Sequence, residues 1–253
     1  MNQEQRAKAT FFLFAYNQEE YIAAACRSAF AQTYSPLEII ISDDCSKDKT
    51  YEIIKKLVSE YDGEHRVICR QNNENLGLIQ HVNKAFQVST GELIVAAAGD
   101  DISMPNRVEC LVRAYIENKK TPLVIHSSVI KINQAGDTIG VMIPPVVDQK
   151  MNLLDLAVSE ALYIGATGAW SRKLHEKYGP IVFNEAFEDL VFGFRAALEN
   201  SLVYLDVPLV KYRVTVGLSS FGGLPFIAFK RRLIDRRRKI KAVLDSFAQR
   251  LQD

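Results

Sequence analysis

Two adjacent carboxylates, Asp100 and Asp101, are the residues of this sequence whose position most directly suggests chemistry. They follow the apolar run Leu93–Ala98, whose composition is typical of a strand buried on both faces. In open α/β sheets ligands bind where such strands end, and two like charges there are costly to desolvate unless a positive charge compensates them. Because neighbouring strand residues point to opposite faces, we expect one carboxylate to hold a divalent cation and the other to bind a ligand hydroxyl or a structural partner.

Two further acidic pairs each allow a structural and a functional interpretation. Asp43 and Asp44 follow an apolar segment at residues 37–41 and could simply form a turn or cap the next helix. Functionally, Asp44 could accept a hydrogen bond from a nucleobase N–H. Glu188 and Asp189 open a predicted helix, where they either complement the helix dipole by ~0.3–1 kcal/mol or supply a general base.

Together the three pairs describe a group transfer. A cation at Asp101 would neutralise a diphosphate leaving group as a Lewis acid, and a carboxylate at Asp189 would accept the proton of an attacking sugar hydroxyl. The transition state would resemble the oxocarbenium ion of glycoside hydrolysis, with an alcohol in place of water. The sequence has no Gly-x-x-x-x-Gly-Lys loop, no Gly-x-Gly-x-x-Gly after its first strand and no Gly-x-Ser-x-Gly elbow. These absences argue against a P-loop hydrolase, a dinucleotide oxidoreductase and a serine hydrolase.

The elements that would position these residues alternate between strand and helix. We predict four strands, at residues 10–15, 37–41, 66–70 and 93–98. A helix follows each strand: the first covers residues 18–32, the second ends near residue 61, the third covers residues 78–88 and the fourth ends near residue 118. Asn17 would cap the first helix and Ser103 the last, with Pro105 in its first turn. Such units predict a mostly parallel sheet with helices on both faces, and right-handed crossovers bring all four strand ends to one edge. Tyr16, the pairs at 43–44 and 100–101, and the turn at 72–77 should therefore converge there.

The second half of the chain is less regular. We predict a hairpin from residues 123–132 and 138–142 around a turn at 134–137, helices at 153–162 and 190–199, and extended chain at 202–213. The small residues at 164–170 would let the backbone approach a ligand closely.

The composition is that of an ordinary globular protein: 253 residues, 48% hydrophobic and 24% charged, with a net charge of +1. The neutral balance gives no reason to expect a nucleic-acid partner. The four cysteines show no Cys-x-x-Cys spacing, which argues against a zinc site or a disulfide framework and for a reducing compartment. The polar residues 1–8 are no signal peptide, and no apolar run approaches the ~20 residues of a membrane span. We expect a cytoplasmic protein, either free or at the inner face of the membrane.

Several short motifs, each weak alone, occur in an order and spacing that resemble the family 2 glycosyltransferases, inverting enzymes with a GT-A nucleotide-sugar-binding fold. The motifs are Ala15-Tyr16-Asn17, the segment from Ile41 to Thr50, Asn75-Leu76-Gly77, Gly91-Glu92, Gly99-Asp100-Asp101 with Pro105, Glu188-Asp189 with Arg195, and Tyr212-Arg213. The resemblance covers residues 10–220. It implies an α/β fold with a mostly parallel central sheet and helices on both faces.

The resemblance also implies how a nucleotide-sugar donor binds. Tyr16 would pack on the nucleobase, Asp44 would bind its imide edge, and Asp100 would contact the ribose or phosphate side. The donor site would be completed by Glu19, Asn75 and Gly77.

For the reaction itself, the resemblance implies that Asp101 ligates Mg²⁺ or Mn²⁺ and that Asp189 is the catalytic base, with Glu188 as its substitute. Gly168 and Trp170 fall where family members line the donor-sugar and acceptor pocket. Trp170 could stack on a sugar face, but a lone tryptophan is more often part of a core or interface, and we prefer that interpretation.

The sequence departs from the family pattern at three positions. Phe14 replaces the proline or threonine usual before Tyr-Asn, which would alter the base pocket. Ala98 stands where many members carry the first carboxylate of an Asp-x-Asp motif, which leaves fewer metal ligands. Thr215 stands where a histidine often follows Tyr-Arg, which removes a phosphate contact from the closing loop. Arg195 resembles a structural helix residue.

A basic amphipathic tail at residues 222–253 would follow a glycosyltransferase domain at residues 1–221. Lysines and arginines crowd residues 230–241, and apolar residues recur at helical spacing (Phe226, Leu233, Ile240, Leu244, Phe247 and Leu251). Three interpretations stay open: a helix packed on the domain, contact with an anionic membrane surface, and self-association. We favour the first.

The sequence thus predicts an inverting glycosyltransferase that moves a sugar from a UDP, dTDP or GDP donor to a hydroxyl of a glycan or lipid-linked acceptor, in surface polysaccharide assembly. One alternative is a non-catalytic nucleotide-sugar or glycan-binding module on the same fold, for which Ala98 and Thr215 are the motivation. A nucleotidyltransferase is the other, and the lack of a Gly-rich basic loop after the first strand speaks against it.

Overall fold

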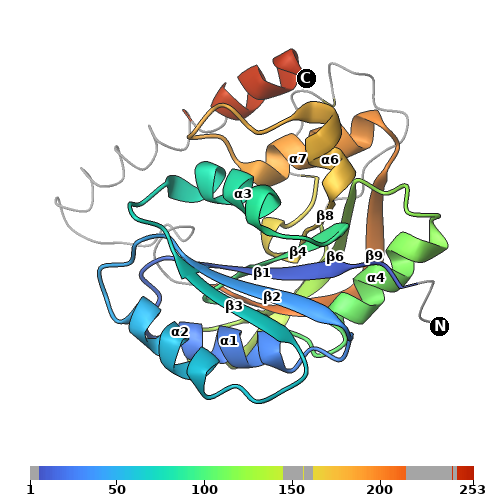
Figure 1. The fold of residues 1–253 in the computed structure, drawn as a ribbon. Helices are drawn as coiled ribbons and strands as arrows, with labels where there is room; N and C mark the ends of the chain where they lie inside the picture. Colours follow the sequence, from blue (N-terminus) through green and yellow to red (C-terminus); the bar gives the residue numbers. More distant parts are fainter. Residues whose placement is uncertain (1–5, 145–155, 157–161, 215–240, 242–243) are drawn as a thin grey trace.

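The computed structural model describes residues 6–144, 156, 162–214, 241 and 244–253. Within these residues, nine strands form one sheet in the order β3-β2-β1-β4-β8-β6-β9-β5, with β7 paired to β6. Helices cover both faces of this sheet (Figure 1). The predicted α/β fold is confirmed.

The first four strands are parallel and make up one half of the sheet. They are β1 (Ala9–Ala15), β2 (Leu37–Asp43), β3 (Arg66–Gln71) and β4 (Leu93–Ala98), and β1 lies between β2 and β4. Their register places the carboxyl ends of β1, β2 and β4 level with one another, since Phe14 pairs with both Ser42 and Ala98. The predicted convergence of strand ends is therefore present.

Alternate residues of the buried strands enter two separate cores, one on each face of the sheet. On one face, Phe11 and Leu13 pack with α1 (Ile22–Phe30), α2 (Thr50–Ser59) and α4 (Arg107–Glu117). On the other, Phe12 packs with α3 (Gly77–Val88), α6 (Arg172–Tyr178) and α7 (Glu188–Leu198). Because both faces are covered, β1, β2 and β4 are apolar along nearly their whole length.

The other half of the sheet is mixed. β8 (Ala169–Ser171) runs antiparallel to β4 and to β6 (Val124–Ile132), and β9 (Leu202–Arg213) runs parallel to β6. β7 (Thr138–Met142) completes the predicted hairpin with β6. The two-residue strand β5 (Ile102–Ser103) pairs with the end of β9, and a 3₁₀ turn, η2 (Gly165–Thr167), precedes β8. The end of β9 is thereby brought beside the residues that follow β4.

Two predicted helix caps are wrong. The first helix begins at Ile22 and not at 18, because Asn17 has a left-handed backbone (φ 50°) and its Oδ1 accepts a hydrogen bond from the N–H of Lys47 instead. Ser103 lies in β5, and Asn106 precedes α4. In both places a contact with a distant segment overrides the local capping signal.

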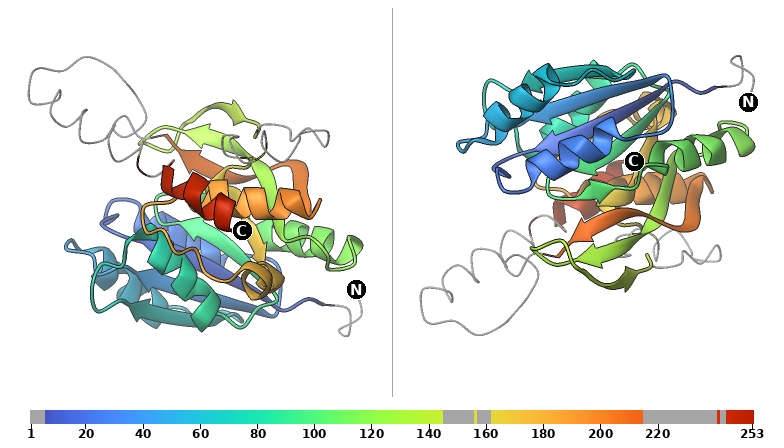
Figure 2. Two further views of the ribbon diagram at one scale, coloured as in Figure 1. Left: turned by 90° about the horizontal axis from the view of Figure 1, so that it is seen from above. Right: turned by 90° about the horizontal axis from the view of Figure 1, so that it is seen from below.

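The described end of the tail is a helix at residues 244–252 that lies beside α7 (Figures 1 and 2). Phe247 packs against the small cluster formed by Leu156, Leu162 and Phe194 of α7, whereas Leu244 and Leu251 are exposed. The predicted helix at 153–162, Thr215 and nearly all of the basic stretch at 230–241 lie outside the described residues. Of the helices that the structure describes, none has the length and apolar composition that crossing a membrane requires.

Candidate functional site

Backbone hydrogen bonds join the carboxyl ends of the parallel strands into one edge. The N–H of Asp44 donates to the carbonyl of Ala15 at 2.8 Å, and the N–H of Gly99 donates to the carbonyl of Phe14 at 2.9 Å. The N–H of Asn72 donates to the carbonyl of Asp43 at 2.8 Å. The residues predicted to bind a donor are thus adjacent in space, and we call this region the strand-end site.

At the start of the strand-end site, Tyr16 leaves β1 with 45% of its surface exposed. Asn17 and Glu19 tie the first loop to the second. The N–H of Asn17 donates to Ser46 Oγ at 2.9 Å. Glu19 Oε2 accepts the N–H of Lys49 at 2.9 Å. Tyr16 therefore has the exposed aromatic face that base stacking requires, whereas Glu19 holds the loop.

Asp44 is buried, and its carboxylate already organises the turn at residues 72–77. Oδ1 accepts the N–H of Leu76 at 2.9 Å and Asn72 Nδ2 at 2.7 Å, and Oδ2 accepts the N–H of Gly77 at 3.0 Å. Gly77 adopts φ 74°, a conformation that a side chain would strain. Asn75 Nδ2 donates to the carbonyl of Asp44 at 3.4 Å. The structure shows that Asp44 holds the turn at residues 72–77. Its hydrogen bond to a nucleobase stays a prediction.

Asp101 is buried, and a positive residue of β9 fastens it. Its Oδ1 accepts the backbone N–H of Arg213 at 2.7 Å, and Arg213 Nε donates to the carbonyl of Asp100 at 2.9 Å. Burial, and then the charge of Asp100, raise the pKa of Asp101 to about 7. Arg107, fully buried, opposes this shift, and burial in turn lowers its own pKa to about 9. Asp100 itself is half-buried, and burial raises its pKa too.

The donor set at Asp101 fits a divalent cation that is held mainly by a bound diphosphate. Asp101 Oδ2 is buried and accepts no hydrogen bond from the described residues. Across the same part of the chain, no cluster of three or more His, Cys, Asp or Glu side chains could hold a metal alone. Mg²⁺ commonly binds through one or two carboxylates together with substrate phosphates, and Asp101 Oδ2 matches that pattern.

Tyr212, at the end of β9, links the strand-end site to the start of α7. Burial raises its pKa, and the negative charges of Asp101, Asp100 and Asp189 raise it further. All three carboxylates are therefore within electrostatic reach of this one ring. The structure thus brings together carboxylates that lie some 90 positions apart in the sequence.

Glu188 and Asp189 occupy the first turn of α7 and are pressed against η2. A Cβ added to Gly165 would overlap Glu188 Oε1 and lie 3.6 Å from Asp189 Oδ2, so a side chain there would require Glu188 to move. Burial raises the pKa of both carboxyl groups. The charge of Asp189 raises the pKa of Glu188 further.

The surroundings of the pair favour Asp189 as the anion. Its Oδ1 accepts the N–H of Leu190 at 2.8 Å, and both the backbone N–H of Gly165 and the positive charge of Arg250 lower its pKa. No positive charge is among the causes that shift the pKa of Glu188, so Asp189 is the member of the pair whose ionised form is better stabilised. An ionised Asp189 is the form that a general base requires.

Residues 10–179 match the family described as glycosyl transferase family 2. The chain belongs to glycosyltransferase family 2. Among its relatives, the Escherichia coli UDP-Glc:alpha-D-GlcNAc-diphosphoundecaprenol beta-1,3-glucosyltransferase WfaP is 34% identical over 99 residues, which cover 39% of this chain and 38% of WfaP. The chain spans less than half the length of the first curated relatives it matches.

Two solved structures show that the fold is the GT-A fold. Residues 1–349 of S. aureus TarS in complex with UDP-GlcNAc superpose with a TM-score of 0.63 at 20% identity, over 96% of this chain and 69% of TarS. The mannosyltransferase PcManGT from Pyrobaculum calidifontis, in complex with GDP-Man and Mn²⁺, gives a TM-score of 0.63 at 17% identity, over 98% of this chain and 65% of PcManGT.

In this family 2 chain, Trp170 lies in the core, which is the interpretation preferred from the sequence, and not in an acceptor pocket. Trp170 is 1% exposed and packs against Phe14, Phe86 and Phe192, with its Nε1 donating to Tyr163 Oη at 3.2 Å. A ring enclosed in this way has no face to offer a sugar, so the core interpretation holds. Gly168 is buried as well.

Sequence reasoning missed two arginines near the proposed site, Arg107 and Arg250, and gave Arg213 no role beyond its place in the Tyr212-Arg213 motif. Arg107, Arg213 and Arg250 each contact backbone at or near the carboxylates. Arg107 follows Pro105 and lies on the apolar face of a helix. An arginine at such a position is the sequence signal that could have predicted a buried charge near the site. Arg195 is structural as expected: it is fully buried and pairs with Asp253.

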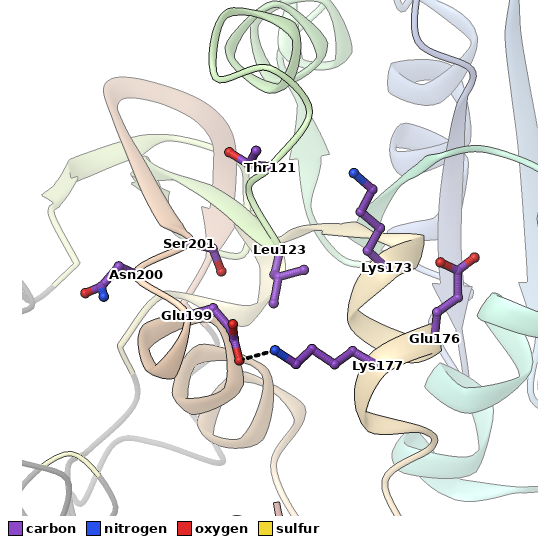
Figure 3. Close-up of a pocket in the computed structure, with 8 residues that line it drawn as sticks. All are labelled: Thr121, Leu123, Lys173, Glu176, Lys177, Glu199, Asn200 and Ser201. Atoms are coloured by element: carbon purple, nitrogen blue, oxygen red, sulfur yellow. Dashed lines mark hydrogen bonds and ion pairs between the residues drawn. The ribbon is translucent and has the colours of Figure 1, made fainter.

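A surface pocket lies at the carboxyl end of α7, away from the strand-end site and from Glu188 and Asp189. Lys173 and Lys177 of α6, together with Glu199, line it, and Lys177 pairs with Glu199 across it (Figure 3). None of the predicted donor, metal or catalytic residues lines this pocket.

Proposed function

We propose that the protein is an inverting glycosyltransferase that moves a sugar from a nucleoside diphosphate donor to a hydroxyl of a glycan or lipid-linked acceptor. The observation that carries this proposal is the position of η2, which joins the strand-end site to the start of α7. Arg107 Nη2 donates to the carbonyls of Ala96 at 2.6 Å and of Ala166 at 2.9 Å, and Gly165 lies against Glu188 and Asp189. Family membership supports it, since a base at Asp189 would then act beside the strand edge at which ligands bind in open α/β folds.

In the proposed complex, the nucleobase stacks on the exposed ring of Tyr16, above the turn that Asp44 holds. The diphosphate points toward Asp100 and Asp101, and the sugar lies between these residues and Asp189. Pre-formed loops of this kind reduce the ordering cost of binding.

The transfer is a single displacement at the anomeric carbon. Asp189 accepts the proton of the acceptor hydroxyl as its oxygen forms the new bond, and the bond to the diphosphate oxygen breaks. The nucleoside diphosphate leaves with the electron pair, and the configuration at the anomeric carbon inverts. Glu188, which keeps its proton, leaves Asp189 as the single basic carboxylate of the pair.

Asp101 would hold Mg²⁺ or Mn²⁺ through Oδ2. A divalent cation there supplies neutralising charge to a departing diphosphate. The Mn²⁺ in the structure of PcManGT with GDP-Man supports this proposal.

The nature of the donor and acceptor is also proposed. The printed ligands of TarS and PcManGT, UDP-GlcNAc and GDP-Man, support a UDP or GDP sugar, with dTDP as a third candidate. The acceptor named for WfaP, a sugar on diphosphoundecaprenol, supports a lipid-linked acceptor in surface polysaccharide assembly. Such an acceptor would place the protein in the cytoplasm at the inner face of the membrane.

The test is release of nucleoside diphosphate from a panel of UDP, dTDP and GDP sugars, with lipid-linked and free glycans as acceptors. We expect one donor to turn over, and Asp189→Asn to lose roughly 100-fold or more in kcat while still binding the nucleotide. Unchanged turnover in Asp189→Asn would contradict the assignment of the base.

A non-catalytic nucleotide-sugar-binding module is the second candidate. Ala98, in place of a carboxylate, and the lack of a three-residue metal cluster among the residues described favour it. It predicts that the chain binds a nucleotide sugar, but that no donor and acceptor pair is turned over.

A further inference from the structure

The C-terminal helix, residues 244–252, docks against the start of α7 through polar side chains. Ser246, Gln249 and Arg250 are all buried, and together with Asp253 they lie at i, i+3, i+4 and i+7 on one face of the helix. Figures 1 and 2 show this helix beside α7. Its buried face is therefore unlike the apolar stripe by which an ordinary surface helix packs.

Two of these side chains complete the start of α7. Phe187, which precedes the helix, makes no side-chain cap. Instead, its backbone N–H donates to Ser246 Oγ at 2.9 Å. Gln249 Oε1 accepts the N–H of Val182 at 2.8 Å in the loop that leads to α7. Since the first N–H groups of a helix have no partner within it, the C-terminal helix supplies from outside what the local sequence lacks.

Arg250 adds a positive charge at the same place. Its Nε donates to the carbonyl of Leu190 at 3.0 Å, one residue beyond Asp189, and its guanidinium lies over the ring of Phe194 at 5.5 Å. These contacts fix the guanidinium against the first turn of α7. Other groups face Asp189 from Glu188 on α7 and from Tyr212 on β9. Both of these are acids, whereas Arg250 is a cation whose positive charge lowers the pKa of Asp189.

We propose that Arg250, presented by the C-terminal helix, is a positioning residue that holds the first turn of α7, and with it the carboxyl group of Asp189, at the transferase site. The inference rests on the proposed function, in which Asp189 is the base. It assigns a role in the reaction to a segment beyond residues 10–179, the part of the chain that matches the family. A helix that merely braces the fold would contribute stability but would leave the protonation of Asp189 unchanged.

The test compares the full chain with Arg250→Gln, Arg250→Lys and the control Gln249→Leu, which removes a buried contact of the same helix without changing charge. For each protein, kcat and KM are measured from pH 5 to 9 with the donor that is turned over. The carboxyl carbon of Asp189, assigned with Asp189→Asn, is titrated by NMR in ¹³C-aspartate-labelled protein.

In Arg250→Gln we expect kcat to fall roughly 10-fold or more, donor KM to stay within about 2-fold, and the acid limb of the rate profile to move to higher pH. The NMR titration of Asp189 should move in the same direction. Arg250→Lys should recover most of the wild-type pH–rate profile. Gln249→Leu should lower Tm but leave the pH–rate profile and the titration of Asp189 unchanged. Where Arg250→Gln does not fold, Arg250→Met, which keeps packing on Phe194, replaces it.

An unmoved titration of Asp189 in the charge-removing variant overturns the proposal, and so does an equal fall in kcat in Gln249→Leu. The proposed function fails separately. In that case the wild type turns over no nucleotide sugar, although the titration of Asp189 still moves in Arg250→Gln.

Discussion

Asp101 and Arg213 are joined by a hydrogen bond of 2.7 Å from the backbone N–H of Arg213 to Asp101 Oδ1. This bond fastens the last residue of β9 to the carboxylate that follows β4. The guanidinium of Arg213 then bonds to the carbonyls of Asp100, Asn133 and Gln134. One residue thus ties the loop that follows β4 and the turn between β6 and β7 to the end of β9, around the proposed diphosphate site.

We predict that Arg213→Lys weakens this junction, because an ammonium cannot reach three carbonyls held by a planar fork. The free energy of unfolding should fall by about 2 kcal/mol, and the affinity for a nucleoside diphosphate should fall with it. Denaturant unfolding and calorimetric titration measure both. Arg113→Lys, at an exposed position, is the matched control, and equal stability of the two variants would refute the role given to Arg213.

Gly165 should be needed for the geometry of the catalytic pair. Alanine there would overlap Glu188 Oε1, so we expect Gly165→Ala to lower kcat by roughly 10-fold or more while leaving nucleotide binding intact. In a Glu188→Ala background the overlapping atom is gone, and the same substitution should then cost much less. Equal losses in both backgrounds would show that the contact is not the cause.

The sequence predicted the strands that position the site, but not the long-range contacts that hold the loops around it. Apolar runs such as Leu93–Ala98 mark buried strands wherever they occur, and their parallel arrangement brings Tyr16, Asp44 and Asp101 to one edge. By contrast, the predicted caps at Asn17 and Ser103 are wrong because each residue bonds or pairs with a segment far away in sequence. Asn17 accepts the N–H of Lys47, and Ser103 pairs with Val210 of β9. The same holds for Arg250, whose contact with α7 depends on a helix 60 residues later in the chain.

Trp170 should behave as a core residue. We expect Trp170→Ala to lower the free energy of unfolding by about 3–5 kcal/mol, since it leaves a cavity among three phenylalanine rings. Trp170→Phe should cost less and leave acceptor KM unchanged. A large rise in acceptor KM in a stably folded Trp170→Phe would restore the sugar-stacking role.

Stability should fall in mild acid because of His126. Burial lowers its pKa to about 4, and its Nδ1 accepts no hydrogen bond from the described residues. The unfolded state therefore takes up the proton first, and the contribution of the neutral imidazole is complete above pH 6.5 and lost as the pH falls toward 4. The loss should reach about 3 kcal/mol. His126→Phe removes this titration, so wild type and variant unfolded side by side from pH 7 to 4 should diverge; parallel curves would contradict the prediction.

The central claim is that the edge formed by β1, β2 and β4 binds a nucleoside diphosphate with a divalent cation at Asp101. Thermal unfolding of the wild type and of Asp101→Asn with UDP, dTDP or GDP, each with and without Mn²⁺, tests it most directly. A ligand at 100 times its Kd stabilises the folded state by about 2.7 kcal/mol. We predict that one diphosphate raises the Tm of the wild type, that Mn²⁺ raises it further, and that Asp101→Asn loses the increment due to Mn²⁺. If no diphosphate raises the Tm of the wild type, the claim is contradicted.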